Sequence, residues 1–349
     1  MRLPGEAEAV VIGGGVVGLS IAARLAEAGV ETVLLERGRL GSGASRATAD
    51  VLRAYFAGDP AGSALAVRSL AAYRRLPGGP PMRQVGYLVL FTAPGQVAAF
   101  EAELPGQRAA GVRLELIGAE EARRRNPLVD EPSLLGAAWS PQAYVSDTAA
   151  IVRSLAGAAV RAGAALHVHC PVTAVDADTG RVETSAGTVT ARAIVCAAGA
   201  WSSWMIAAAG VDLPLSGPAV QELLTTGPLP GIPDIPVTLH AASGLLLRKR
   251  DGGLLIGMGF PGPGREAWLA GVRNRLAAIY PGVDLSGLRT AVTGPRDAGP
   301  SRTACIGRRR GPVPFLYATG FSGHGLCQAP AAGELVRDLY LGHDPEEVS

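Results

Sequence analysis

The sequence is short of the features that mark secreted, membrane-bound and nucleic-acid-binding proteins. Its 349 residues include four cysteines, Cys170, Cys196, Cys305 and Cys327, whose spacing fits neither a disulfide framework nor a zinc site. We therefore expect free thiols and a reducing, cytoplasmic location. The formal net charge is +2 at pH 7, which is too close to zero to predict nucleic acid or an anionic membrane as a partner.

Apolar runs that could cross a membrane are also scarce. The uncharged stretch over residues 193–211 contains glycines and the pair Ser202 and Ser203, which favour a buried strand followed by a helix over a membrane span. Residues 1–8 carry acids and lead directly into an apolar strand, so no signal peptide is expected. Hydrophobic residues make up 48% of the chain, which predicts a globular protein of one or two domains with a large core.

Glycine is plentiful, and the most informative glycines follow the first apolar strand. Residues 13–18 read GGGVVG, between a strand predicted over residues 9–12 and a helix. Gly13 permits a tight turn, Gly15 lets the backbone approach a pyrophosphate, and Gly18 lets the helix pack closely on the strand. The start of the helix then directs unpaired N–H groups and partial positive charge at the phosphates.

An acidic residue completes this dinucleotide-binding pattern. A second strand is predicted over residues 32–35 and ends at Glu36, whose carboxylate can accept both ribose hydroxyls and would repel a 2′-phosphate. The pattern alone does not separate FAD from NAD. The chain has no second complete glycine fingerprint, which argues against a pyridine-nucleotide reductase with its own NAD domain.

Three further segments resemble a known family. Arg37 and residues 41–45 (GSGAS) resemble the flavin-contacting segment of the D-amino-acid oxidase superfamily of FAD enzymes, which includes glycine and sarcosine oxidases. Residues 320–325 (GFSGHG) are similar to a string in its amine-oxidising branch, and residues 251–259 to a hairpin in relatives of dye-linked proline dehydrogenase β subunits. The resemblance implies hydride transfer from the C–N bond of an amino acid or N-alkyl amino acid to flavin N5, giving an imine that water hydrolyses.

The expected fold class is α/β, with an α+β second domain. Residues 1–82, 145–212 and 295–349 are expected to form a discontinuous, Rossmann-like FAD-binding domain. Residues 83–144 and 213–294 are expected to form an interleaved substrate-binding domain built on an antiparallel sheet.

Three residues are candidates for direct contact with the substrate or the reacting flavin. The resemblance places Arg296 where family members bind the substrate carboxylate, and an arginine suits this role because its planar fork makes two charge-assisted bonds. The alternative for Arg296 is a structural ion pair with an acid of the protein. Arg53 is expected near the flavin and substrate or else on the surface, and His324 is expected near the flavin or else packed in a loop.

The motif and the resemblance together give a larger set of expected FAD contacts. These residues are Gly13, Gly15, Val16, Val17, Gly18, Glu36, Arg37, Ser42, Gly43, Ala44, Ser45, Val172, Ala198, Gly199, Trp201, Gly320, Ser322, Gly323, His324, Gly325 and Leu326. No metal site is expected, because no carboxylate or cysteine supports His167 and His169 at a suitable spacing.

The fate of the electrons and the attachment of FAD are less well defined. Sarcosine-oxidase-like members have a lysine at the position of Cys327, where it promotes reaction with oxygen, so both O2 and another electron acceptor stay open. Some relatives bind FAD covalently through a cysteine in the segment around Gly294. Here Cys305 comes only after that segment, so we expect non-covalent FAD.

A different class of function also fits the sequence. Relatives serve as flavin-binding electron-transfer or assembly subunits inside larger dehydrogenase complexes. The run Arg308, Arg309 and Arg310 is either a docking patch for such a partner or a solvated loop. A homo-oligomer and a heteromeric complex both stay open.

Overall fold

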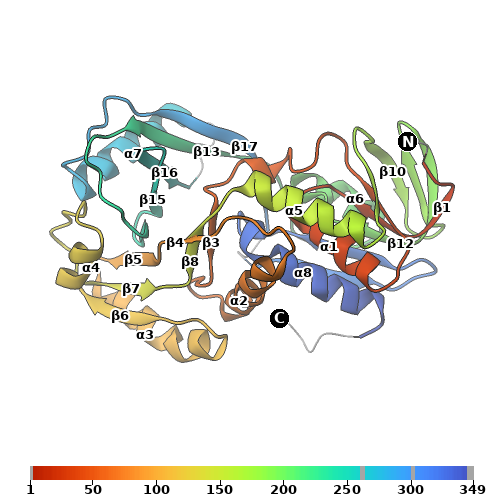
Figure 1. The fold of residues 1–349 in the computed structure, drawn as a ribbon, viewed down its shortest axis with the longest axis horizontal. Coiled ribbons are helices and arrows are strands. Elements are labelled where there is room, and N and C mark those ends of the chain that lie inside the picture. The colour runs from red at the N-terminus through yellow and green to blue at the C-terminus, as the bar shows by residue number, and fades with distance from the viewer. Residues whose placement is uncertain (1–2, 260–263, 300–302, 344–349) are drawn as a thin grey trace.

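The first sheet is mixed, with a parallel centre. In a computed structural model that describes residues 3–259, 264–299 and 303–343, it has eight strands (Figure 1). The parallel strands are, in spatial order, β19 (Phe315–Thr319), β12 (Gly187–Cys196), β1 (Glu6–Ile12), β2 (Thr32–Leu35) and β9 (Ala165–His167). Antiparallel strands extend it at β18 (Cys305–Arg309), β11 (Arg181–Thr184) and β10 (Val172–Asp176).

Helices cover both faces of this sheet, and the first strand is buried on both sides as expected for a parallel centre. Ala9 and Val11 belong to the core beneath α1 (Val16–Glu27), α5 (Thr148–Arg161) and α8 (Gly325–Tyr340). Val10 and Ile12 face the opposite layer, which contains α6 (Ser202–Ala208). The stretch at residues 193–211 is thus a buried strand followed by a helix, as predicted. No helix among the described residues is long and apolar enough to span a bilayer.

The second sheet is antiparallel except at one pair. Its strands are, in spatial order, β17 (Arg289–Ala298), β13 (Ser216–Pro228), β16 (Gly253–Met258), β15 (Leu245–Arg250), β14 (Val237–His240), β5 (Tyr87–Phe91), β7 (Gly136–Ser140) and β6 (Glu115–Gly118). Only β14 and β5 run parallel. Helices α3 (Pro94–Ala109), α4 (Ala119–Arg125) and α7 (Arg265–Ile279) lie at this end of the molecule (Figure 1).

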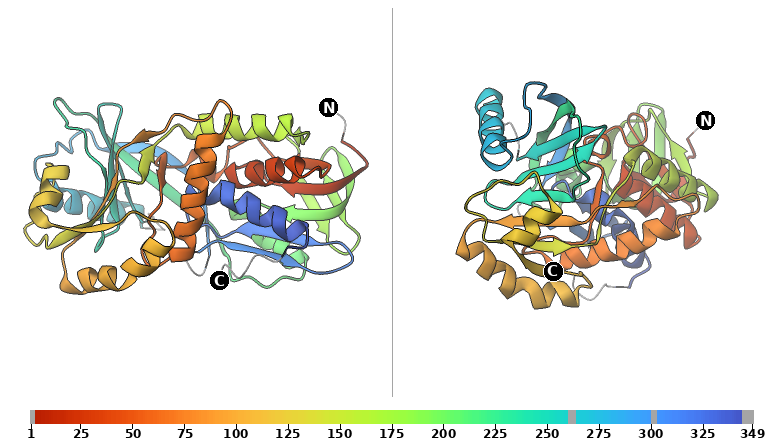
Figure 2. Two further views of the ribbon diagram at one scale, coloured as in Figure 1. Left: turned by 60° about the horizontal axis from the view of Figure 1, so that its bottom comes forward. Right: turned by 60° about the vertical axis from the view of Figure 1, so that its left-hand side comes forward.

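Short elements lie between the two large sheets. A three-stranded sheet contains β3 (Val51–Arg53), β8 (Ala143–Val145) and β4 (Arg83–Gln84), and helical turns occur at η1 (Ala44–Arg46) and η2 (Gly199–Trp201). Helix α2 (Pro60–Arg75) crosses the N-terminal end of α8 (Figure 2). Asp59 caps α2 by accepting a hydrogen bond from the Gly62 N–H at 2.8 Å, because the first turn of a helix leaves its N–H groups without partners.

This arrangement confirms the predicted α/β class with a separate antiparallel sheet. The second sheet takes strands from residues 83–144 and from residues 213–294, while β17 continues to Ala298, beyond the proposed boundary at residue 294. The division into two domains at those boundaries stays a proposal. The sequence also predicts a helix over residues 330–341. That start is wrong, because α8 begins at Gly325 and contains Pro330.

Candidate functional site

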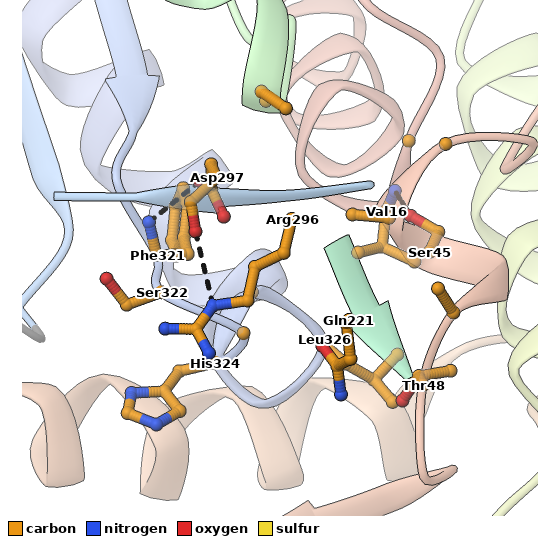
Figure 3. A pocket seen from close by; sticks show the side chains of 18 of the residues that line it. Val16, Ser45, Thr48, Gln221, Arg296, Asp297, Phe321, Ser322, His324 and Leu326 are labelled. Carbon is orange, nitrogen blue, oxygen red and sulfur yellow. Dashed lines mark hydrogen bonds between the residues drawn. The ribbon is translucent and has the colours of Figure 1, made fainter. Parts of the chain in front are cut away.

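A cavity of about 890 Å³ lies where the two large sheets and the N-terminus of α8 meet. Its wall includes the glycine turn after β1, the segment around η1, the turn after β12, one face of the second sheet, and the loop between β19 and α8. Figure 3 shows Val16 and Ser45 on one side of this space and Arg296, Asp297 and His324 on the other.

The glycine turn fits an extended phosphate-containing ligand. Gly13 has φ +114°, and a Cβ there would lie 2.3 Å from the carbonyl oxygen of Ala197. A Cβ on Gly18 would lie 1.9 Å from the carbonyl oxygen of Gly13, so Gly18 sits behind the turn and not in the cavity wall. Gly15 precedes α1 and has no side-chain cap, and the next N–H, of Val16, donates to the Ser45 hydroxyl at 3.1 Å. The helix N-terminus therefore opens onto the cavity with its positive partial charge.

Glu36 is fixed at the edge of this turn. Its side chain accepts hydrogen bonds from the Gly14 and Gly38 N–H groups, both at 2.7 Å, and only 9% of the residue is exposed. An ionised carboxylate has about four acceptor positions, so two protein bonds leave capacity for two ribose hydroxyls. Next to it, the Arg37 guanidinium stacks 3.4 Å from the centroid of the Trp201 ring.

Most of the predicted FAD contacts lie in the cavity wall. Beyond those described above, the wall contains Val17, Gly43, Ala44, Val172, Ala198, Gly199, Ser322, Gly323, Gly325 and Leu326. Three predicted contacts lie outside it, namely Gly18, Ser42 and Gly320. Ser42 directs its hydroxyl toward Gly38, where a Cβ would lie 3.0 Å away, and Gly320 packs against Cys305 and Leu215.

The loop between β19 and α8 has an unusual backbone. Gly320, Ser322 and Gly323 have φ values of +69°, +52° and +86°. The carboxylate of Asp297 holds the loop by accepting the Phe321 N–H at 2.9 Å (Figure 3). The Ser322 hydroxyl also accepts the Gly299 N–H at 3.3 Å. Strand β17 therefore fixes the turn that carries the α8 N-terminus into the cavity.

Arg296 projects into the cavity from the same strand. Its Nε donates to the Asp297 carbonyl oxygen at 3.3 Å, which orients the guanidinium plane (Figure 3). A Cβ on Gly323 would lie 3.7 Å from Arg296 Cδ and Nε, so the arginine side chain packs against this loop at van der Waals distance. Sequence reasoning missed Asp297, which is 8% exposed and whose pKa is raised by burial. The signal was an acid directly after the expected anchor, inside a strand.

Arg53 and His324 line the cavity and also pack against aromatic rings. The Arg53 guanidinium lies 3.9 Å from the Phe56 ring centroid and 5.0 Å from that of Tyr87, and it donates to the Tyr55 carbonyl oxygen. The His324 ring lies 4.4 Å from the Phe56 ring. Arg53 is thus half-buried in the cavity wall and does not lie on the open surface. For His324 both interpretations have support, because it lines the cavity and also packs against Phe56.

The second sheet contributes an apolar floor. We define the sheet floor as Tyr87, Leu223, Leu239, Leu246 and Met258, all of which line the cavity. Gly257 pairs with Leu246, which in turn pairs with Leu239. A Cβ on Gly257 would lie 2.9 Å from Leu223 Cδ2, so the glycine makes room for the Leu223 side chain in the floor. Gln221 adds a polar side chain at its edge (Figure 3).

Comparison with known proteins identifies the family. The family model described as "DAO: FAD dependent oxidoreductase" matches residues 8–339. The chain belongs to this family. The resemblance to the D-amino-acid oxidase superfamily is therefore confirmed, the protein is an FAD-dependent enzyme, and the glycine turn and Glu36 fit that cofactor.

Individual members of the DAO family match nearly the whole chain. Glycine oxidase of Bacillus licheniformis is 29% identical, over 96% of this chain and 93% of its own. Mitochondrial dimethylglycine dehydrogenase of Mus musculus is 28% identical over 97% of this chain, which spans only 43% of that longer protein. The crystal structure of L-proline dehydrogenase from P. horikoshii superposes with a TM-score of 0.89 at 29% identity, over 99% of this chain and 96% of the other.

Asp50 and the arginine run at residues 308–310 make contacts within this DAO-family member itself. Asp50, next to the cavity segment, directs its carboxylate to Arg248 at 3.1 Å and accepts the Thr148 hydroxyl at 2.8 Å. In the arginine run, Arg308 donates to the Leu339 carbonyl oxygen at 2.7 Å and Arg309 pairs with Asp178 at 2.6 Å. These contacts weaken the case for a docking patch. No metal-binding group of three histidine, cysteine or acidic side chains occurs among the described residues.

Proposed function

We propose that this protein oxidises the C–N bond of an amino acid or N-alkyl amino acid, giving an imine that water hydrolyses. The observation that carries the proposal is a single cavity joining the dinucleotide turn, Arg296 and the sheet floor. Bound FAD supplies hydride acceptance at N5. The names of the relatives, which include glycine oxidase and L-proline dehydrogenase, support substrates of this kind.

Arg296 is proposed to bind the substrate carboxylate. The hydrogen bond from its Nε to the backbone at Asp297 fixes the guanidinium plane, so the substrate meets a preoriented fork. Asp297, the next residue, is buried, and Arg296 itself is half-buried in the cavity wall. Holding the amine-bearing carbon about 3–3.5 Å from its reaction partner supplies much of the acceleration, so no strong side-chain base is needed.

The sheet floor is proposed to receive the apolar part of the substrate. Its leucine and Met258 side chains offer no hydrogen bonds, so they present an apolar surface to a substrate side chain or N-alkyl group. Burying apolar substrate surface there would contribute roughly 25 cal/mol per Å². Amino acids with apolar bodies should thus be preferred over those with a second charge.

The N-terminus of α8 is proposed to stabilise negative charge at the edge of the reduced cofactor, with Gly323, His324 and Gly325 closest to it. Of the four cysteines, all of them described and free, Cys327 lies in the cavity wall. Its thiol donates to the Val51 carbonyl oxygen at 3.4 Å, and burial raises its pKa. These features support non-covalent FAD, and they leave either O2 or another acceptor for the electrons. The free thiols also support a cytoplasmic location.

Anaerobic mixing with amino acids and N-methyl amino acids tests the proposal. Bleaching of the yellow cofactor by members of the panel is expected, and no bleaching across a broad panel would instead favour an electron-transfer or assembly subunit. Oxygen uptake in the same samples separates oxidase from dehydrogenase.

The role of Arg296 is tested with Arg296→Met. Two lost charge-assisted bonds of about 1.5–3 kcal/mol each should raise KM for the carboxylate substrate roughly 10²–10⁴-fold. Arg289→Met is the matched control, because Arg289 lies on the same strand and is exposed. Equal KM values for the two variants would remove Arg296 from the substrate site.

A further inference from the structure

Helix α8 contains a proline at a position where the helix needs a hydrogen-bond donor. Pro330 is the sixth residue of α8, and a regular helix would use the N–H of residue 330 to bond the Leu326 carbonyl oxygen. Proline has no N–H, and its ring also crowds that carbonyl group. Both residues are buried, with Leu326 only 8% exposed, so bulk water does not supply the missing donor.

Helix α2 supplies the missing partner. The Tyr73 hydroxyl donates to the Leu326 carbonyl oxygen at 2.8 Å, and Tyr73 is 1% exposed. One turn earlier on the same face, the fully buried Ser69 hydroxyl accepts the Ala331 N–H at 3.1 Å. Two backbone groups on either side of the proline are thus satisfied by two side chains spaced four residues apart.

A third bond extends this contact toward the start of α2. The buried Gln328 side chain donates to the Gly62 carbonyl oxygen at 3.1 Å, seven residues before Ser69 and therefore on the same face. Burial raises the pKa of Tyr73 well above its usual value, which favours the protonated hydroxyl that donates this bond. Figure 2 shows α2 crossing the N-terminal end of α8 at this place.

The segment held in this way is the one that faces the cofactor cavity. Gly325, Leu326 and Cys327 line the cavity as the first residues of α8, directly after the strained turn at Ser322 and Gly323. Leu326 is therefore both a wall residue of the cavity and the acceptor of the Tyr73 bond. Any tilt of the first turn of α8 would move the N–H groups that point into the cavity.

We propose that Tyr73, assisted by Ser69, is a positioning residue of the FAD site. Its hydrogen bond replaces the one that Pro330 removes and sets the direction of the α8 N-terminus. Tyr73 acts through Leu326 and touches no ligand itself. The proposal rests on the cofactor of the family and not on the substrate proposed above, so failure to find an amino-acid substrate would leave it intact.

The test compares Tyr73→Phe with Tyr280→Phe in the holoenzyme. Tyr280 is a matched control because it is fully buried in the second hydrophobic cluster and its hydroxyl has no hydrogen-bond partner among the described residues. Leaving a buried carbonyl oxygen unpaired should weaken FAD retention roughly 5- to 100-fold in Tyr73→Phe. Hydrogen exchange at residues 325–329 should also accelerate, and Tyr280→Phe should change neither quantity.

A second variant shows whether the effect comes from the proline. Pro330→Ala restores an N–H that can donate to the Leu326 carbonyl oxygen. In a protein that carries Pro330→Ala, adding Tyr73→Phe should therefore weaken FAD retention much less. Should Tyr73→Phe alone fail to fold, the double variant and Ser69→Ala still allow the comparison with Tyr280→Phe. Unchanged FAD retention and exchange in Tyr73→Phe, or equal effects of that change with and without Pro330, would overturn the proposal.

Discussion

Replacing Asp50 with alanine should destabilise the protein by about 3–5 kcal/mol, because it leaves a buried arginine without its partner. The Arg248 side chain is 5% exposed, and burial lowers its pKa to about 10, so it stays charged at neutral pH. The Arg248 Nη2 atom lies 3.1 Å from the Asp50 carboxylate. Two charges at that distance attract by about 5 kcal/mol at an effective dielectric constant of about 20. Arg250, at 4.0 Å from the same carboxylate, adds to the uncompensated positive charge.

The variant Asp50→Asn removes the negative charge but keeps the size of the side chain. Asp50→Asn can still accept the Thr148 hydroxyl, so it should cost about 1 kcal/mol less than Asp50→Ala. Asp251→Ala is a close control, since Asp251 is also an aspartate at positive φ, 50° against 53°, but its side chain is 89% exposed. Both alanine variants then carry the same cost of placing alanine at positive φ. The difference between their free energies of unfolding therefore measures the loss of the buried ion pair between Asp50 and Arg248.

Thermal unfolding with saturating FAD measures the effect. At roughly 2 °C per kcal/mol for a chain of this size, Asp50→Ala should lower the Tm by about 6–10 °C. The double variant Asp50→Ala with Arg248→Met should lose much less than the sum of the single changes, because neither charge is then left alone. Similar Tm values for Asp50→Ala and Asp251→Ala, or additive losses in the double variant, would refute the reasoning.

Two further predictions concern Gly18 in the glycine turn and Asp297, which holds the loop between β19 and α8. Gly18→Ala places a methyl group 1.9 Å from the Gly13 carbonyl oxygen and should abolish FAD retention, measured as bound flavin absorbance. The control Gly118→Ala should retain FAD fully, because open space surrounds Gly118. For Asp297, whose folded pKa is raised above 3.8, the stability that this carboxyl contributes is present below 3.8 and is lost as pH rises through the folded pKa. The Asp297→Asn variant can still accept the Phe321 N–H but does not titrate. Its free energy of unfolding, relative to that of the wild type, should therefore increase as pH rises from about 4. Parallel pH profiles of unfolding for the two proteins would contradict this prediction.

The sequence was most informative where structure depends on near neighbours. The turn at residues 13–18 needs glycine for reasons of space that any such turn imposes, and the second strand was predicted with the bounds that β2 has, Thr32–Leu35. The cap of α2 at Asp59 was likewise predictable, because a capping side chain bonds a residue three positions away.

Long-range partners were not predictable in this way. Asp50 shortly follows the flavin-like segment at residues 41–45, but its partner Arg248 lies 198 residues further along the chain. The hydroxyl that compensates for Pro330 inside α8 belongs to Tyr73, which lies 253 residues before Leu326. A single sequence carries no signal for either pairing.

The order of strands in the first sheet has a consequence for biosynthesis. β1 pairs with β12 about 180 residues later, β12 pairs with β19 near the C-terminus, and α1 packs on α8. The glycine turn emerges from the ribosome first, but its surroundings exist only after the last helix has been translated. Flavin should therefore be captured only after α8 has been translated, and until then the nascent chain exposes apolar strands that chaperones would have to protect.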